Sequence, residues 1–181
     1  MAQSMHLIVL KETGHVLGAL SGAAFAADPT LEDLCGEAFP VSGVRRAASP
    51  GNPGVVLVPR EQLALKSVTL DPAVLAACRD YIIDGTHLTR IVPPGGVPAV
   101  SLDQDKVNLA GLGEKTLVAI GGADDPEADR RIGIASSIPF SPIMLGTIPD
   151  GAVAMPVVAG AQCMVMVATL GKPIRVVRET A

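Results

Sequence analysis

Aromatic residues are nearly absent from this chain, which has no tryptophan, one tyrosine and three phenylalanines among its 181 residues. The apolar core must therefore be built from valine, leucine, isoleucine, alanine and methionine. Proteins that bind single-stranded nucleic acid need aromatic side chains for base stacking, and phosphate contacts need clustered cations. No run of lysine and arginine exceeds two residues, and the formal net charge is −4. Nucleic acid is therefore not an expected partner.

Charged residues are also scarce. They make up 18% of the chain, whereas hydrophobic residues make up 49% and the mean hydropathy is +0.43. A typical soluble domain has about 25% charged residues. Monomeric proteins rarely leave large apolar patches exposed to water. We therefore expect the chain to bury apolar surface against copies of itself, or against other protein subunits.

Cysteine is rare and unpaired in sequence. The three cysteines are Cys35, Cys78 and Cys163. They form no CxxC pair and lie among apolar neighbours, which predicts free thiols in a reducing compartment, the cytoplasm. Residues 15–27 resemble the apolar part of a signal peptide, but the preceding Lys11 is followed by Glu12, so the cationic segment of such a peptide is missing.

Two long uncharged segments dominate the C-terminal third of the chain. Gly151–Gly171 is 21 residues long, residues 132–149 form another 18, and Asp150 separates them. The longer segment has the length of a membrane-spanning helix. Pro156 and Gly160 divide it into pieces of strand length, which favours strands buried on both faces over a membrane span, so no membrane partner is expected. Such strands need a second layer, from this chain or from a neighbour.

Short β-type runs separated by glycine and proline predict the fold class. We expect one mainly β domain over residues 1–181, a sandwich or barrel of about ten short strands. Residues 6–10 and 15–20 predict a hairpin in which Gly14 takes a left-handed conformation. Further strands are expected near 55–58, 62–70, 87–92, 98–102, 116–120, 132–135, 142–148, 152–159, 162–169 and 173–178.

Two Asp-Pro pairs predict the starts of two helices. Asp71 as N-cap and Pro72 as the first helical residue begin an amphipathic helix over 72–84, because its apolar residues recur on one face. Asp28-Pro29 begins a short helix over 29–35, which Gly36 ends. Residues 40–54 are rich in turn formers and predict an exposed loop or insertion.

The chemical motifs of the chain are near misses. Residues 110–116 lack the Gly-Lys pair of a phosphate loop, and residues 103–108 lack ligands that a calcium loop needs. Four carboxylates within 124–129 are interpreted as a charged loop that keeps an apolar protein soluble. We therefore assign no catalytic, cofactor-binding or metal-ligating residue, and we expect no cofactor.

The leading hypothesis is a structural subunit that buries apolar strand surface, within residues 132–170, in a homo-oligomer or a larger protein complex. One alternative is a small-molecule-binding β module with an apolar pocket. The pocket would be lined by Met144, Met155, Met164 and Met166. The other alternative is an enzyme with a dispersed His/Asp site. Its residues would include His15, His87, Asp103 and Asp105.

Overall fold

Strands are the main element of this protein. The computed structural model describes residues 3–21, 28–42, 55–91, 97–103, 106–122, 143–146, 148, 150–154 and 162–180. Over these residues the strands β1 to β14 form several antiparallel sheets, and the helices are short. The mainly β prediction is confirmed. No helix within these ranges is long and apolar enough to cross a membrane.

The N-terminal sheet has the strand order β2-β1-β5. Its strands are β1 (Ser4–Leu10), β2 (Val16–Ser21) and β5 (Leu63–Thr69). β1 and β2 form the hairpin expected from the sequence, with Gly14 at φ +70°. A residue with a Cβ is disfavoured there, so Gly14 explains why the chain turns at this point.

Two more sheets are formed by the C-terminal half. The larger has the order β11-β10-β13-β14, and the smaller the order β12-β9-β8. The larger sheet contains β10 (Thr116–Gly122), β11 (Ile143–Gly146), β13 (Gln162–Thr169) and β14 (Arg175–Thr180). The smaller contains β8 (Ala99–Asp103), β9 (Lys106–Ala110) and β12 (Gly151–Ala154). Two separate hairpins complete the strands: β3 (Ala38–Ser42) with β4 (Val55–Pro59), and β6 (Tyr81–Asp84) with β7 (His87–Arg90).

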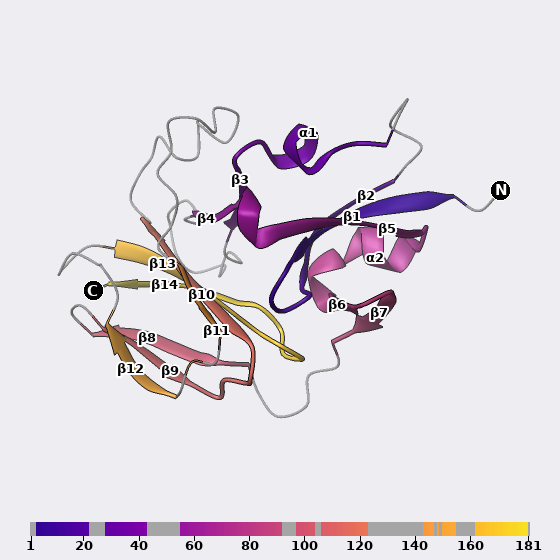
Figure 1. Cartoon of the computed structure of the whole chain (residues 1–181). Helices are drawn as coiled ribbons and strands as arrows, with labels where there is room; N and C mark the ends of the chain where they lie inside the picture. Colours follow the sequence, from indigo (N-terminus) through magenta and orange to yellow (C-terminus); the bar gives the residue numbers. More distant parts are fainter. Residues whose placement is uncertain are drawn as a thin grey trace.

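The sheets stack in layers, and the chain's own layers cover both faces of β13 (Figure 1). Met164, Met166 and Ala168 point into a central core with residues of β1 to β5. The alternate residues of β13 point into a C-terminal core with β9. The central core consists of Ile8, Leu10, Leu17, Val41, Val56, Val58, Leu63, Leu117, Ala119, Met164, Met166 and Ala168. The C-terminal core consists of Val107, Leu109, Val118, Ile120, Ile148, Cys163, Val165 and Val167. This stacking of sheets fits the sandwich alternative.

The strand β1 is buried in the same way. Ile8 and Leu10 reach the central core, and the alternate residues reach an N-terminal core under α2 and β6. The N-terminal core consists of Met5, Leu7, Val9, Val16, Val74 and Ile83. In Figure 1 α1 lies on the opposite side of the N-terminal sheet from α2, in agreement with these two sets of contacts.

The predicted helix over 72–84 is wrong beyond its first turns. α2 (Pro72–Ala76) begins as expected, because Asp71 accepts a hydrogen bond from the Ala73 N–H. A 3-10 turn (Cys78–Asp80) follows, and residues 81–84 form β6. The helical pattern fails because β6 pairs with β7 and with the first hairpin, where Ile82 bridges to His15. β-branched residues favour such paired, half-buried positions.

The first short helix is confirmed with a shifted start. α1 (Leu31–Cys35) is capped by Thr30, not by Asp28, and ends at Gly36 with φ +60°. Residues 40–42 of the expected loop belong to β3, because they pair with β4 in a hairpin. Residues 43–54, the expected strand at 132–135 and the carboxylates of 124–129 lie outside the described residues.

The layered core generates a stability prediction. Leu117 is fully buried in the central core, whereas Leu170 is 40% exposed. Leu117→Ala should lower the free energy of unfolding by about 2–5 kcal/mol, because it removes buried methyl groups and leaves a cavity. The control Leu170→Ala should change it by less than about 0.5 kcal/mol. Urea unfolding followed by circular dichroism measures both, and equal losses would contradict the layered core.

Candidate functional site

The first hairpin ends in a tip, residues 11–15, that packs on β6 and buries Thr13 and His15. The Gly14 N–H donates to the Leu10 carbonyl at 2.9 Å, and the Ile83 N–H donates to the Gly14 carbonyl at 2.8 Å. A Cβ added to Gly14 would lie 2.3 Å from the Ile83 carbonyl oxygen. The tip and β6 are therefore in direct backbone contact, and the position admits no side chain.

His15 lies next to this contact and is fully buried. Its Nε2 lies 2.6 Å from the Lys172 carbonyl oxygen, and its Nδ1 lies 2.8 Å from Thr13 Oγ1. A carbonyl oxygen can accept but not donate, so the hydrogen is assigned to Nε2. In the neutral ring Nδ1 is then the acceptor for the Thr13 hydroxyl. Both ring nitrogens are therefore hydrogen-bonded.

Burial controls the ionisation of this histidine. It lowers the pKa of His15 below the ordinary value, because the charged ring would lose its hydration. The hydrogen bond to the Lys172 carbonyl raises the pKa by a smaller amount. The net direction is down, so His15 is neutral at neutral pH, in agreement with the assigned hydrogen positions.

Lys172 extends the contact to the loop between β9 and β10. Its Nζ donates to the Gly111 carbonyl. The Asp150 carboxylate accepts from the Gly111 N–H at 3.0 Å and from the Leu112 N–H at 2.9 Å. These backbone bonds lower the pKa of Asp150, and the Lys172 charge adds to the effect. Thr13, His15, Lys172, Gly111 and Asp150 form one connected set, which we call the polar joint.

A pair of buried threonines anchors the neighbouring strands. Thr116 Oγ1 and Thr169 Oγ1 lie 2.6 Å apart, and both side chains are fully buried. The Leu170 N–H donates to the Lys115 carbonyl at 2.9 Å, and the Lys172 N–H donates to the Thr169 carbonyl at 3.0 Å. These bonds hold the turn between β13 and β14 in the position from which the Lys172 carbonyl reaches His15.

The polar joint can connect layers, but its geometry does not favour acid–base chemistry. A general base needs a free nitrogen within reach of a substrate. Both nitrogens of His15 bind groups of the protein, and the ring is buried. Asp150 uses both carboxylate oxygens to bind the backbone of one loop. The set therefore fixes the relative positions of four chain segments: the hairpin tip, the β13–β14 turn, the β9–β10 loop and Asp150 before β12.

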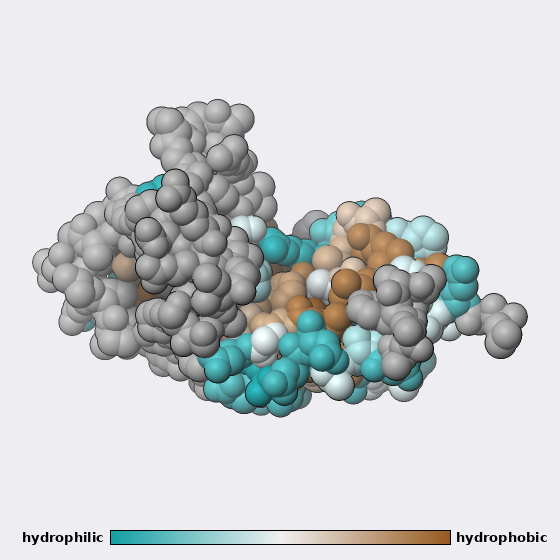
Figure 2. Space-filling model, turned by 90° about the horizontal axis from the view of Figure 1, so that it is seen from above, coloured by the Kyte–Doolittle hydropathy of each residue, from teal (hydrophilic) through white to brown (hydrophobic). Residues whose placement is uncertain are grey.

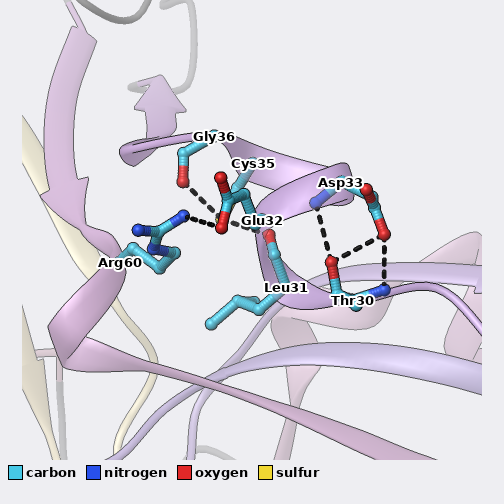
Figure 3. A network of polar contacts seen from close by, with 7 residues as sticks. All are labelled: Thr30, Leu31, Glu32, Asp33, Cys35, Gly36 and Arg60. Atoms are coloured by element: carbon cyan, nitrogen blue, oxygen red, sulfur yellow. Dashed lines mark hydrogen bonds and ion pairs between the residues drawn. The ribbon is translucent and has the colours of Figure 1, made fainter.

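A second polar network surrounds α1 (Figure 3). Thr30 and Asp33 form a capping box, and Glu32 pairs with Arg60 at 3.0 Å. Cys35 Sγ donates to the Leu31 carbonyl at 3.0 Å. Burial raises the pKa of the Cys35 thiol, and the charge of Arg60 opposes this effect. The thiol is therefore protonated at neutral pH. The ion pair between Glu32 and Arg60 joins the helix to the 3-10 turn Arg60–Gln62.

The candidate residues of the two alternative functions are dispersed. Met164 and Met166 fill the central core, and Met155 and the side chain of Met144 lie outside the described part of the chain. His87 is exposed on β7 and Asp103 is exposed on β8. Neither is a hydrogen-bond partner of the His15 ring, and Asp105 is not described. Within the described ranges no three His, Cys, Asp or Glu side chains form a group that could hold a metal ion.

Sequence reasoning missed most of the polar joint. It placed His15 among the residues of a dispersed His/Asp site, gave no role to Thr13, and assigned Asp150 and Lys172 only to turns. Thr13 precedes the turn glycine, and Asp150 and Lys172 adjoin Gly151 and Gly171. A polar residue next to a turn glycine is a weak signal, because most such residues are simply solvated.

Comparison with known proteins adds no functional information. No family model, no curated protein and no solved structure matches the chain. A functional statement must therefore come from the geometry of the chain itself.

The hairpin tip generates a prediction with a matched control. Gly14 and Gly85 both have positive φ, but a Cβ on Gly85 would meet nothing within 4 Å. Gly85→Ala should cost about 1–2 kcal/mol of unfolding free energy, the cost of a left-handed conformation. Gly14→Ala should cost about 1–3 kcal/mol more, because its Cβ collides with the backbone of β6. Urea unfolding compares the two variants, and equal losses would show that the tip does not pack on β6.

Asp150 generates a pH-dependent prediction. Because its folded pKa is lowered, the carboxylate contributes stability above its ordinary pKa, and this contribution is lost as the pH falls through the folded value. Asp150→Asn should therefore unfold at lower urea than the unaltered protein at pH 7, and the gap should close in strong acid. The control Asp84→Asn alters an exposed carboxylate on β6. A gap that persisted unchanged into acid would contradict the assigned role of the Asp150 charge.

Proposed function

We propose that this protein is a structural subunit that assembles with copies of itself in the cytoplasm. The observation that carries the proposal is an apolar face beside α1, on the side of the N-terminal sheet opposite α2. The face consists of Leu20, Leu31, Leu34, Phe39 and Leu65, which are partly buried and pack against the central core. We call it the α1 face. In Figure 2 apolar atoms gather on the side of the molecule that carries α1, with hydrophilic atoms beside them.

The location of the expected interface changes with the structure. The sequence pointed to residues 132–170 as the surface buried between protomers. Within that range β13 already has a layer of this chain on each face. The α1 face has one described layer beneath it, so it is the better candidate for contact with a second copy. Burial of such side chains contributes roughly 25 cal/mol for each Å² of apolar surface removed from water.

The charges near the α1 face support a partner of the same kind. Glu32 and Arg60 lie at its border and form an ion pair at 3.0 Å, with 74% and 39% of their side chains exposed. A twofold interface brings the same patch of both copies together, so it needs both signs of charge on one patch. Glu32 of each copy can then meet Arg60 of the other.

The hydrogen bonds of the buried polar side chains and the state of the cysteines agree with a structural role. The buried His15, Thr13, Thr116 and Thr169 all bind groups within the chain. Cys35, Cys78 and Cys163 form no disulfide bond in the described structure. Free thiols are typical of proteins in reducing compartments, which is the support for a cytoplasmic location. The ligand-binding and enzymatic alternatives remain predictions, because no observation favours either of them over assembly.

Light scattering after size-exclusion chromatography tests the proposal. The unaltered protein should elute with a multiple of the 18.5 kDa chain mass. Leu34→Glu places a charge on the α1 face and should shift the mass toward one chain. Because Leu34 also packs against the central core, circular dichroism is used to select conditions in which the variant is folded. The control Leu170→Glu alters a side chain that is 40% exposed on another segment and should keep the assembled mass.

Two results would overturn this proposal. One is a mass of a single chain for the unaltered protein at every concentration up to the limit of solubility. The other is an assembled mass that persists in a folded Leu34→Glu variant. If Leu34→Glu does not fold, Leu31→Glu tests the same face from the start of α1.

A further inference from the structure

The polar joint connects segments that are far apart in the chain. The His15 ring and the Lys172 carbonyl are separated by 157 positions in sequence. On its backbone side, His15 accepts a hydrogen bond from the Leu10 N–H and bridges to Ile82 of β6. One imidazole therefore links the N-terminal hairpin and β6 to the turn between β13 and β14.

The acceptor role of Nδ1 requires a neutral ring. In the neutral state Nε2–H donates to Lys172 and Nδ1 accepts from the Thr13 hydroxyl. A second proton would go to Nδ1, which would then have to donate to Thr13 Oγ1. The Thr13 hydroxyl would have to turn its hydrogen toward another acceptor, although Thr13 is itself fully buried. Protonation thus keeps the Nε2–H bond to the Lys172 carbonyl and reverses the Nδ1 bond, so that the Thr13 hydroxyl hydrogen loses its acceptor. It also places a charge in a fully buried site, which favours an open, hydrated ring.

The charged groups around His15 bind other partners, and the Asp150 carboxylate of the joint binds the Gly111 and Leu112 N–H groups. On the hairpin tip Lys11 and Glu12 are exposed, and the Lys11 Nζ donates to the Glu61 carbonyl. On the turn, Lys172 directs its ammonium group to Gly111. The titratable side chains of β6 are Tyr81 and Asp84. Among the described residues none of these side chains forms an ion pair with the His15 ring.

We propose that the polar joint is a pH-sensitive contact, which opens when His15 gains a proton and so loosens the hairpin tip from the β13–β14 turn. In the open state the ring is hydrated and binds a proton as an ordinary histidine does. This inference concerns a contact within one chain and does not depend on assembly through the α1 face.

The direction of the effect follows from proton linkage. The closed ring has a lowered pKa, and the open ring has the ordinary value, about 6.5. At a pH between these two pKa values, the open state therefore binds more protons than the closed state. When the pH lies above the ordinary histidine pKa, the frequency of opening does not depend on pH. For each pH unit below that pKa, opening becomes up to about tenfold more frequent, until the pH reaches the lowered pKa of the closed ring.

Hydrogen exchange of backbone amides tests this proposal. The amides of Leu10, Ile83 and Leu170 bind carbonyls at or beside the joint. After correction for the intrinsic pH dependence of exchange, their opening should become more frequent between pH 7 and pH 5. His15→Gln keeps an N–H donor near the Nε2 position but does not titrate, so its opening should not change with pH. The control His87→Gln alters an exposed histidine on β7 and should behave as the unaltered protein.

Ring NMR of the unaltered protein makes the test independent of how well the variants fold. With labelled histidine, His15 should show the Nε2–H tautomer at pH 7, and its protonation should coincide with the loss of amide protection. An identical pH response in a folded His15→Gln variant would overturn the proposal. Full protonation of His15 with no change in protection of these amides would overturn it too.

Discussion

The structure depends on strands that are apolar on both faces. β13 sends alternate side chains into the central and C-terminal cores, and β1 does the same toward the central and N-terminal cores. Each such strand needs a layer on either side, because water would be in contact with whichever face was left open. The stacked arrangement of sheets follows from this requirement, and so does the low number of charges in the chain.

A stack of layers has a second requirement, which the polar joint meets. Where the hairpin tip, the β13–β14 turn and the β9–β10 loop come together, backbone groups leave the sheets and need other hydrogen-bond partners. His15 binds the carbonyl of Lys172, and Asp150 binds two N–H groups of the neighbouring loop. These polar side chains therefore stabilise the arrangement of layers, in keeping with the structural role that we propose. The same use of a titratable ring makes the contact sensitive to acid.

Local patterns predicted those parts of the fold whose cause is local. Gly14 has the positive φ that a hairpin turn needs, Asp71 caps α2, and β13 begins and ends where its apolar run predicts. Residues 77–84 show where this reasoning fails. Their apolar spacing fits a helix, but Ile82 and Ile83 bond to the hairpin tip, and a backbone engaged in such bonds cannot also form a helix. The polar joint was missed for a similar reason, since its residues are separated by up to 157 positions.

The sequence by itself determined that the protein is mainly β, that its core is aliphatic, and that its C-terminal strands are buried on both faces. These properties depend on composition and on residues close together in the chain. The tertiary structure decided which layer covers β13, and that this layer belongs to the same chain. It also decided that His15 binds the turn after β13. It further decided that the apolar side chains of the α1 face are only partly buried. Such outcomes depend on which sheets meet, and that is set by contacts between segments far apart in the chain.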